Sequence, residues 1–379
     1  MAFRTVLQRP GAQWVRGMAT RVPEAPYDVL FCGTDLFARA ALERLVARTE
    51  LYKSIQVLTP PDVAHAWGGK RMRVSPVKQL AQEHKLPHEQ VPENGMDSYA
   101  LPEALQASAA PLLLTASFGH MIPQALLSRF ASPSQTLNLH PSLLPLLRGA
   151  APIQWAIARQ YSTTGVSVQQ LAPQHFDTGN VLGQVSVPVP DGCTYESLAT
   201  KLSAVGADLL VDVIANLRRC DQEAWPQASA EATRAPKLKK SVAVVHWDKW
   251  DADKIDARMR AFGGQYPLTT TLVPAKAAFP RVSVLLREGS SLRRTGQGSL
   301  GEQDAEAAAA LQDQPPGTAT YSPILDAVAV RCAAHEDNVY LVTKLQTQGK
   351  PVRKASDWWL GFHDRGDDQG RIRFAEAQG

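Results

Sequence analysis

Two side chains near the middle of the chain have the types and spacing expected of a catalytic pair. Asn138 and His140 stand two residues apart at the end of a predicted strand, so both point to the same side of a sheet. The amide donates hydrogen bonds, and the imidazole takes up or releases a proton near neutral pH. If the strand is parallel to its neighbours, that side opens into a ligand crevice at the strand's carboxyl end.

A carboxylate in a later loop is a candidate third member. Asp177 follows a predicted strand from Val166 to Leu171, and we place it at the carboxyl end of that strand. It is then expected to meet His140 across the crevice. Each residue alone also has a structural interpretation, namely a turn cap for Asn138, a core histidine, and an Asx turn at Asp177. Their convergence at one predicted pocket favours a catalytic site.

The elements that position these side chains begin near residue 27. An apolar strand from Asp28 to Cys32, a tight turn, and a helix from Phe37 to Ala47 are typical of an α/β domain. Helical stretches separate several further strand candidates, which predicts a Rossmann-like, mostly parallel sheet. Those candidates are Ser54 to Leu58, Pro111 to Ala116, Thr136 to Leu139 and Val166 to Leu171. The first turn holds only one glycine and so gives little support to a dinucleotide site.

A second, smaller domain is expected in the last third of the chain. We predict a catalytic domain over residues 27–218, ending in a helix from Tyr195 to about Leu217, and a polar linker over residues 219–260. Short β-prone runs separated by Pro and Gly over residues 261–365 predict a small, OB-like antiparallel β-barrel. The stretch from Glu288 to Pro316 is interpreted as a flexible insertion, and the tail after Gly361 as loose.

Composition fits two folded domains. The 379 residues are 44% hydrophobic and 20% charged, and no apolar run approaches the roughly 20 residues that cross a bilayer. Four arginines and no acidic residue lie among residues 1–23, interleaved with apolar side chains, which favours a transit peptide of the organellar type, removed near residue 20. A disordered tail is the alternative. The four arginines account for the whole net charge of +4, so any nucleic-acid site must come from local basic patches.

The four cysteines are scattered, without a C-x-x-C pair or histidines at metal spacing. We interpret them as buried apolar fillers in a reduced compartment. They are Cys32, Cys193, Cys220 and Cys332.

The sequence motifs around the candidate site resemble those of a known family. NLHPSLLP over residues 138–145, RGAAPIQ over residues 148–154, and Asp177-Thr178-Gly179 are similar to the folate-dependent formyltransferases, most closely to members that act on methionyl-tRNA. The resemblance covers most of residues 27–265. Three departures are Pro141, where bacterial members usually have glycine, His175-Phe176 before the aspartate, and a loop over residues 60–75 that lacks an expected arginine between two glycines.

The resemblance implies a reaction and a catalytic trio. A formyl group would pass from 10-formyltetrahydrofolate to the amine of methionine esterified to initiator tRNA, in the mitochondrial matrix. Asn138 and His140 would stabilise the oxyanion of the tetrahedral intermediate, and Asp177 would pair with His140. No metal is implied, because the formyl group is already activated.

The binding residues are expected to form two sets. Apolar and backbone-rich walls would hold the pterin ring, and two basic clusters would neutralise tRNA phosphates. The folate set is Phe118, Gly119, Met121, Ile122, Ser142, Leu143, Leu144 and Pro145. The tRNA set is Trp67, Lys70, Arg71, Arg73, Lys237, Lys239 and Lys240. A monomer without a membrane partner is expected.

Three other functions remain open on these residues. An amino-sugar nucleotide formyltransferase would use the same trio with a small-molecule amine. A catalytically silent tRNA-binding protein would keep the basic clusters without turnover. A hydrolase would release formate from the folate, with water as acceptor. The second domain and the basic clusters favour tRNA as the acceptor.

Overall fold

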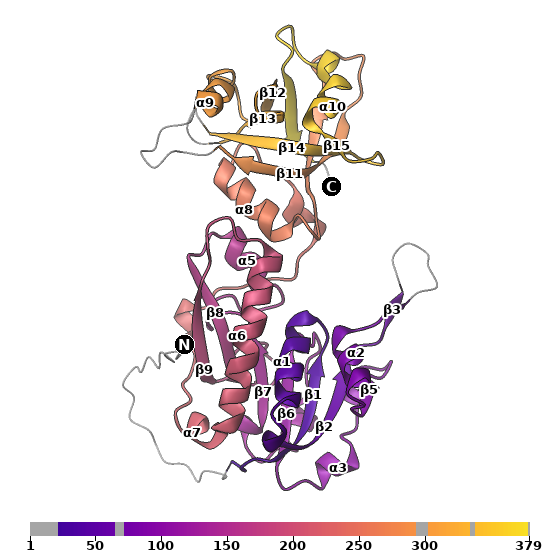
Figure 1. The fold of residues 1–379 in the computed structure, drawn as a ribbon, viewed down its shortest axis with the longest axis vertical. Helices are drawn as coiled ribbons and strands as arrows, with labels where there is room; N and C mark the ends of the chain where they lie inside the picture. The colour runs from indigo at the N-terminus through magenta and orange to yellow at the C-terminus, as the bar shows by residue number, and fades with distance from the viewer. Residues whose placement is uncertain (1–21, 65–71, 293–301, 334–337, 378–379) are drawn as a thin grey trace. The chain divides into compact units, whose positions relative to one another are not determined.

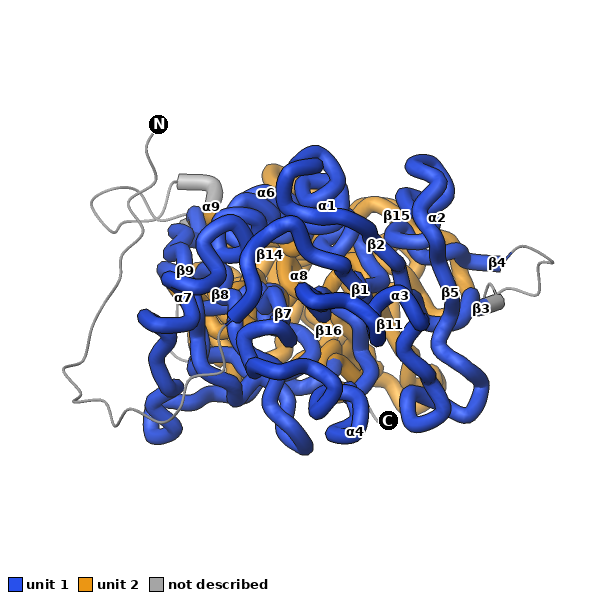
Figure 2. Tube along the Cα trace, turned by 90° about the horizontal axis from the view of Figure 1, so that it is seen from below, with its two compact units in different colours: residues 1–153, 162–190, 196–237 blue, residues 154–161, 191–195, 238–379 orange. Residues whose placement is uncertain are grey.

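The computed structural model describes residues 22–64, 72–292, 302–333 and 338–377. The chain divides into two compact units (Figure 2). Residues 1–153, 162–190 and 196–237 form the first unit, and residues 154–161, 191–195 and 238–379 form the second. Most of the predicted transit peptide, and the side chains of Trp67, Lys70 and Arg71, lie outside the described residues.

The first unit is built on one sheet with the strand order β5-β2-β1-β6-β7-β8-β9 (Figure 1). Pairing is parallel from β5 to β7 and antiparallel for β8 and β9. The predicted α/β architecture with a mostly parallel sheet is therefore confirmed. The strands are β1 (Tyr27–Gly33), β2 (Tyr52–Thr59), β5 (His88–Gln90), β6 (Pro111–Ala116), β7 (Thr136–His140), β8 (Thr163–Gln170) and β9 (Val181–Pro188); β3 (Val63–Ala64) and β4 (Met72–Arg73) form a separate hairpin.

Both faces of this sheet are covered. All seven residues of β1 are buried, as expected for a central parallel strand. On one face Gly206 of α6 lies against Phe37 of α1 and Leu139 of β7, and a Cβ at Gly206 would sit 3.3 to 3.4 Å from those side chains. On the other face Leu30 and Leu113 pack into a separate apolar cluster. The α-helices of the two units together, in chain order, are α1 (Leu36–Val46), α2 (Pro76–Glu83), α3 (Glu103–Gln106), α4 (Gln124–Leu127), α5 (Pro152–Ala158), α6 (Tyr195–Ala215), α7 (Leu217–Gln222), α8 (Ala252–Phe262), α9 (Glu302–Ala309) and α10 (Ala355–Leu360); α8, α9 and α10 belong to the second unit.

The second unit is a closed antiparallel barrel. The order β11-β10-β16-β12-β13-β14 returns to its start through pairing of β14 with β11, and β15 adds to the outside of β14. Closure removes the sheet edges that would otherwise pair with other chains. The predicted small β-barrel is confirmed. Its strands are β10 (Leu268–Val273), β11 (Val282–Ser291), β12 (Thr318–Ser322), β13 (Ala327–Arg331), β14 (Val339–Thr347), β15 (Arg353–Lys354) and β16 (Ile372–Glu376).

Two predictions about the second unit are wrong. The stretch interpreted as a flexible insertion contains the helix α9, where Ala307 and Ala308 are buried against β13 and β14. Burial of these alanines on a neighbouring sheet orders a segment whose polar composition suggested a loop. The tail interpreted as loose contains β16, which lies between β10 and β12 and buries Ile372 and Phe374 in the barrel core.

The prediction that the cysteines are buried is confirmed, because all four are buried and none forms a disulfide. Burial raises the pKa of the Cys32 and Cys332 thiols, which keeps them in the unreactive neutral form.

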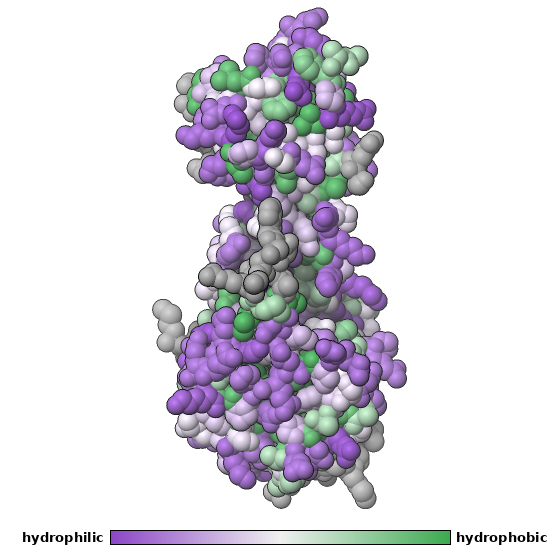
Figure 3. All heavy atoms as spheres, turned by 90° about the vertical axis from the view of Figure 1, so that its right-hand side faces the viewer, coloured by the Kyte–Doolittle hydropathy of each residue, from purple (hydrophilic) through white to green (hydrophobic). Residues whose placement is uncertain are grey.

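On the surface drawn in Figure 3, apolar residues are scattered among hydrophilic ones. No helix in the described part of the chain is long and apolar enough to cross a membrane.

The role of β16 can be tested by stability. Phe374 stacks on Trp247 with ring centroids 6.1 Å apart and is 2% exposed. We expect Phe374→Ala to lower the free energy of unfolding of the second unit by about 3 to 5 kcal/mol. The matched control is Ile324→Ala, at a side chain that is 53% exposed. Equal denaturation midpoints for the two variants would contradict a core position for β16.

Candidate active site

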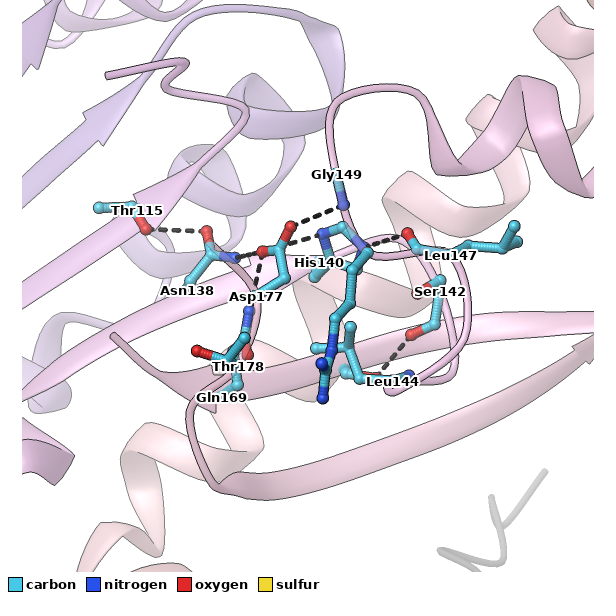
Figure 4. Close-up of polar contacts among 12 residues, drawn as sticks. Thr115, Asn138, His140, Ser142, Leu144, Leu147, Gly149, Gln169, Asp177 and Thr178 are labelled. Atoms are coloured by element: carbon cyan, nitrogen blue, oxygen red, sulfur yellow. Dashed lines mark hydrogen bonds and ion pairs between the residues drawn. The ribbon is translucent and has the colours of Figure 1, made fainter. Parts of the chain in front are cut away.

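β7 brings Asn138 and His140 to one side of the sheet, as predicted (Figure 4). Thr115 on the neighbouring β6 lies directly beside Asn138 in the strand register. Its hydroxyl donates to Asn138 Oδ1 at 2.8 Å, which leaves the amide nitrogen to donate to Asp177 Oδ1 at 3.3 Å. This network therefore determines which way the Asn138 amide faces.

Both ring nitrogens of His140 face oxygen atoms. Nε2 lies 3.1 Å from the carbonyl oxygen of Leu147, and Nδ1 lies 3.5 Å from Asp177 Oδ1. A carbonyl oxygen and a carboxylate oxygen both only accept, so a neutral ring can donate to one of these two oxygens, whereas the imidazolium can donate to both. The ring is buried, with 5% of the side chain exposed.

Asp177 is the centre of the arrangement. Its Oδ2 accepts from the backbone N–H of Gly149 at 2.9 Å, and its Oδ1 accepts from the Gln169 amide at 3.0 Å and from Asn138. Only 9% of the side chain is exposed. A carboxylate this far from water needs such donors, since it loses its hydration. Its backbone has a φ of +57°, in the left-handed region that Asp tolerates better than most residues.

The predicted contact between Asp177 and His140 is confirmed, but the predicted reason for it is wrong. We placed Asp177 at the carboxyl end of a strand parallel to β7, whereas β8 is antiparallel, with Gln169 opposite Asn138. β8 therefore ends beside the start of β7, where the Leu171 N–H donates to the Thr136 carbonyl at 2.8 Å. The loop over residues 171–180 then returns toward the end of β7 and carries the carboxylate to His140.

The residues expected to bind folate fall into two groups. Phe118, Ile122, Ser142 and Leu144 are buried, and Gly119, Met121, Leu143 and Pro145 keep exposed surface. Phe118 and Ile122 belong to the apolar cluster beneath the sheet. The Ser142 hydroxyl donates to the Leu146 carbonyl at 2.6 Å and braces the turn after β7. The second group therefore presents more accessible surface than the first.

The basic residues expected to contact tRNA are exposed wherever they are described. Arg73 lies on β4, which pairs with β3 in a short hairpin. Lys237, Lys239 and Lys240 lie where the chain passes from the first unit to the second. All four present their charge to solvent, as phosphate contacts require.

Sequence reasoning missed the polar groups that hold the trio. Thr115, Gln169 and Gly149 each contact Asn138 or Asp177 directly. A signal existed for Gln169, a polar residue within an apolar strand candidate. Gln227 donates to the backbone carbonyls of Asp177 and Gly179, at 3.0 and 2.8 Å. Nothing in the sequence marked Gln227 as a site residue, because it lies in the stretch that we interpreted as a linker.

The arrangement is suited to hold a developing negative charge. Asn138 is only partly buried, and its amide has a second hydrogen beyond the one that faces Asp177. Preorganised donors of this kind stabilise the oxyanion of a tetrahedral intermediate. Among residues that the structure describes, no group of three or more His, Cys, Asp or Glu side chains is placed to hold a metal ion.

The family follows from comparison with known proteins. Residues 28–214 match the family described as Formyl transferase, and residues 237–363 match its C-terminal domain. A solved N-formyltransferase from Helicobacter canadensis has the same fold, with a TM-score of 0.54 at 14% identity over 85% of this chain and 99% of that one. Together with the relatives below, these matches show that the chain belongs to the formyl transferase family.

The curated relatives point to a particular branch of that family. A methionyl-tRNA formyltransferase from Nitratidesulfovibrio vulgaris is 33% identical over 90% of this chain and 94% of its own length. The human protein named mitochondrial methionyl-tRNA formyltransferase is 34% identical over 69% of this chain. The match spans 66% of the human protein and 62% of the bovine one, just under two thirds of their length.

The role of Asn138 can be tested by truncation. We expect Asn138→Ala to lower kcat for formyl transfer roughly 100- to 1000-fold, because one oxyanion donor is removed. The dissociation constant for tetrahydrofolate, measured by calorimetry, should stay unchanged. Asn216→Ala, at an exposed position at the end of α6, is the matched control. Full turnover in Asn138→Ala would remove this residue from the catalytic group.

Proposed function

We propose that this chain transfers the formyl group of 10-formyltetrahydrofolate to the α-amine of methionyl initiator tRNA. The observation that carries the proposal is the match to the N. vulgaris methionyl-tRNA formyltransferase, which spans 94% of that protein. The trio of Asn138, His140 and Asp177 lies inside the matched Formyl transferase region. The H. canadensis enzyme was solved with folinic acid, a folate, which supports a folate as the donor here.

In the proposed reaction the amine attacks the formyl carbon and the carbonyl oxygen becomes an oxyanion. The free hydrogen of the Asn138 amide donates to that oxygen. His140 joins as a second donor once its ring exchanges the contact with the Leu147 carbonyl for the substrate. The attacking nitrogen loses a proton to Asp177 directly or through a water, and N10 of the folate takes up a proton as the C–N bond breaks. An α-amine titrates near pH 8, so a useful fraction is already neutral.

The folate pocket is proposed at the turn after β7 and the segment after β6. Gly119, Met121, Leu143 and Pro145 would touch the pterin, since their surfaces are accessible. Phe118, Ile122, Ser142 and Leu144 would support these from beneath. The functional assignment of all eight residues rests on the resemblance of the motif.

The acceptor would be held by exposed basic groups. Arg73, Lys237, Lys239 and Lys240 would neutralise phosphates of the tRNA. Trp67, Lys70 and Arg71, which stand between β3 and β4 in the sequence, would contribute as well. We further propose that the chain acts as a monomer on a soluble tRNA.

We propose the mitochondrial matrix as the site of action. Support comes from the mammalian relatives named as mitochondrial and from the basic, acid-free composition of residues 1–23. Import of the labelled full chain into isolated mitochondria, with protease protection and loss of the first 20 or so residues, tests it. A chain without residues 1–23 is the control. Equal import of both chains would contradict the transit peptide.

The decisive experiment compares acceptors. The full chain is incubated with labelled 10-formyltetrahydrofolate and one of three acceptors: methionyl initiator tRNA, a dTDP-amino sugar, or water alone. Formyl-methionyl-tRNA is the expected main product. Formylated sugar would retain the chemistry and overturn the substrate. Formate released without an acceptor would favour a hydrolase, and no product at all would favour a tRNA-binding protein without catalysis.

The same assay tests the lysine cluster. Lys239→Ala combined with Lys240→Ala should raise the KM for methionyl-tRNA and leave the KM for the folate unchanged. Each lysine that neutralises a phosphate contributes to the slope of the logarithm of the tRNA binding constant against the logarithm of the salt concentration. Removing one such lysine lowers the magnitude of that slope by about one. Lys350→Ala, an exposed lysine in the turn before β15, is the control. An unaltered KM for tRNA would place recognition elsewhere.

A further inference from the structure

Residues 225–235 run past both loops that carry the catalytic partners. At one end, Trp225 exchanges two backbone hydrogen bonds with Val181, at the start of β9. At the other end, the Ala235 N–H donates to the Arg148 carbonyl at 2.7 Å, and the Arg148 N–H donates to the Thr233 carbonyl at 2.9 Å. We refer to residues 225–235 as the brace. It belongs to the first unit throughout.

Gln227 joins the brace to the Asp177 loop. Its Nε2 lies 3.0 Å from the Asp177 carbonyl, 2.8 Å from the Gly179 carbonyl and 3.0 Å from Gln169 Oε1. The Gln169 amide nitrogen in turn donates to Asp177 Oδ1 at 3.0 Å. Gln227 therefore holds Asp177 twice, through its backbone carbonyl and through a relay to its carboxylate.

The orientation of the Gln227 amide is set by Arg148. The Arg148 guanidinium donates to Gln227 Oε1 from Nε at 2.9 Å and from a terminal nitrogen at 2.7 Å. Because a guanidinium has only donors, it forces the oxygen of the amide toward itself and the nitrogen toward Asp177. The same series of hydrogen bonds orients the Gln169 amide. Its oxygen accepts from Gln227, so its nitrogen faces the Asp177 carboxylate.

Thr233 joins the other end of the brace to the partner of His140. Its hydroxyl accepts from the Leu147 N–H at 2.8 Å, and the Leu147 carbonyl faces His140 Nε2 at 3.1 Å. Leu147 is held at a φ of +59°, which a bulky residue adopts only when its surroundings impose it. The brace thus contacts the supports on both sides of the His140 ring.

We propose that Gln227 is a positioning residue for formyl transfer, acting from the brace to fix Asp177 against His140. The inference rests on the proposed function and adds to it a residue outside the family motif. The hydrogen bonds that Gln227 donates reach Asp177, Gly179 and Gln169 rather than the Asn138 amide or the His140 ring. Its effect on catalysis therefore passes through Asp177. The effect should appear in kcat, because the substrate-binding groups are unchanged while the catalytic geometry loosens.

The test uses two substitutions that separate packing from donation. Gln227→Ala removes the side chain, whereas Gln227→Glu keeps its shape and its acceptor for Arg148 but cannot donate to Asp177, Gly179 or Gln169. We expect both to lower kcat roughly 10- to 100-fold, with the KM for the folate unchanged. Gln222→Ala and Gln222→Glu, on the exposed side of α7, are matched controls with no expected effect. Retained turnover in Gln227→Glu would overturn donation as the cause.

A double-mutant cycle shows whether Gln227 acts through Asp177. In an Asp177→Asn background, Gln227→Ala should cause no further decrease of kcat, because the group it positions is already compromised. An equal additional decrease in that background would overturn the proposal. It would assign Gln227 an independent or merely structural role.

One readout does not depend on turnover. The Gly149 N–H donates to Asp177 Oδ2, so its hydrogen exchange reports whether the carboxylate stays in place. Exchange should accelerate in Gln227→Ala and stay unchanged in Gln222→Ala. Inactivity of the unmodified chain with every acceptor would contradict the proposed function alone. Unchanged Gly149 exchange in Gln227→Ala would contradict the positioning role alone.

Discussion

A buried carboxylate is the constraint on which the site depends. Asp177 loses most of its hydration, and each donor that replaces the lost water comes from a different segment. Asn138 belongs to β7, Gln169 to β8, and Gly149 to the loop after β7. The carboxylate can be buried only if these segments converge, so its position ties two strands and two loops into one geometry.

That convergence explains the local backbone. Asp177 and Leu147 both have positive φ, and Gly149 has a φ of +120°. A Cβ at Gly149 would lie 2.7 Å from the Ala235 carbonyl oxygen, so a side chain there would push the end of the brace away. Strained or side-chain-free positions gather where the loops must approach closely, as at many functional sites. The regular sheet beneath, with buried strands such as β6 and β7, supplies the rigidity that holds them.

Much of the fold was predictable because it follows from local pattern. A short window of sequence is enough to recognise the apolar runs that form β1, β6 and β7. It is also enough to recognise the helical period of α1 and α6. It is not enough for β16, because Ile372 and Phe374 alternate with charged residues in a short tail. Its partners β10 and β12 lie roughly 50 to 100 positions earlier in the chain. α9 was missed because its alanines are equally compatible with a loop until a sheet covers them.

The sequence by itself determined the chemical groups and their alternation: Asn138 and His140 share a side of one strand because a strand repeats every two residues. Only the tertiary structure decided the direction of β8, the return of the Asp177 loop, and the orientation of the Asn138 and Gln227 amides. Strand direction depends on pairing between distant segments. Amide orientation depends on neighbours such as Thr115 and Arg148, which no local window contains.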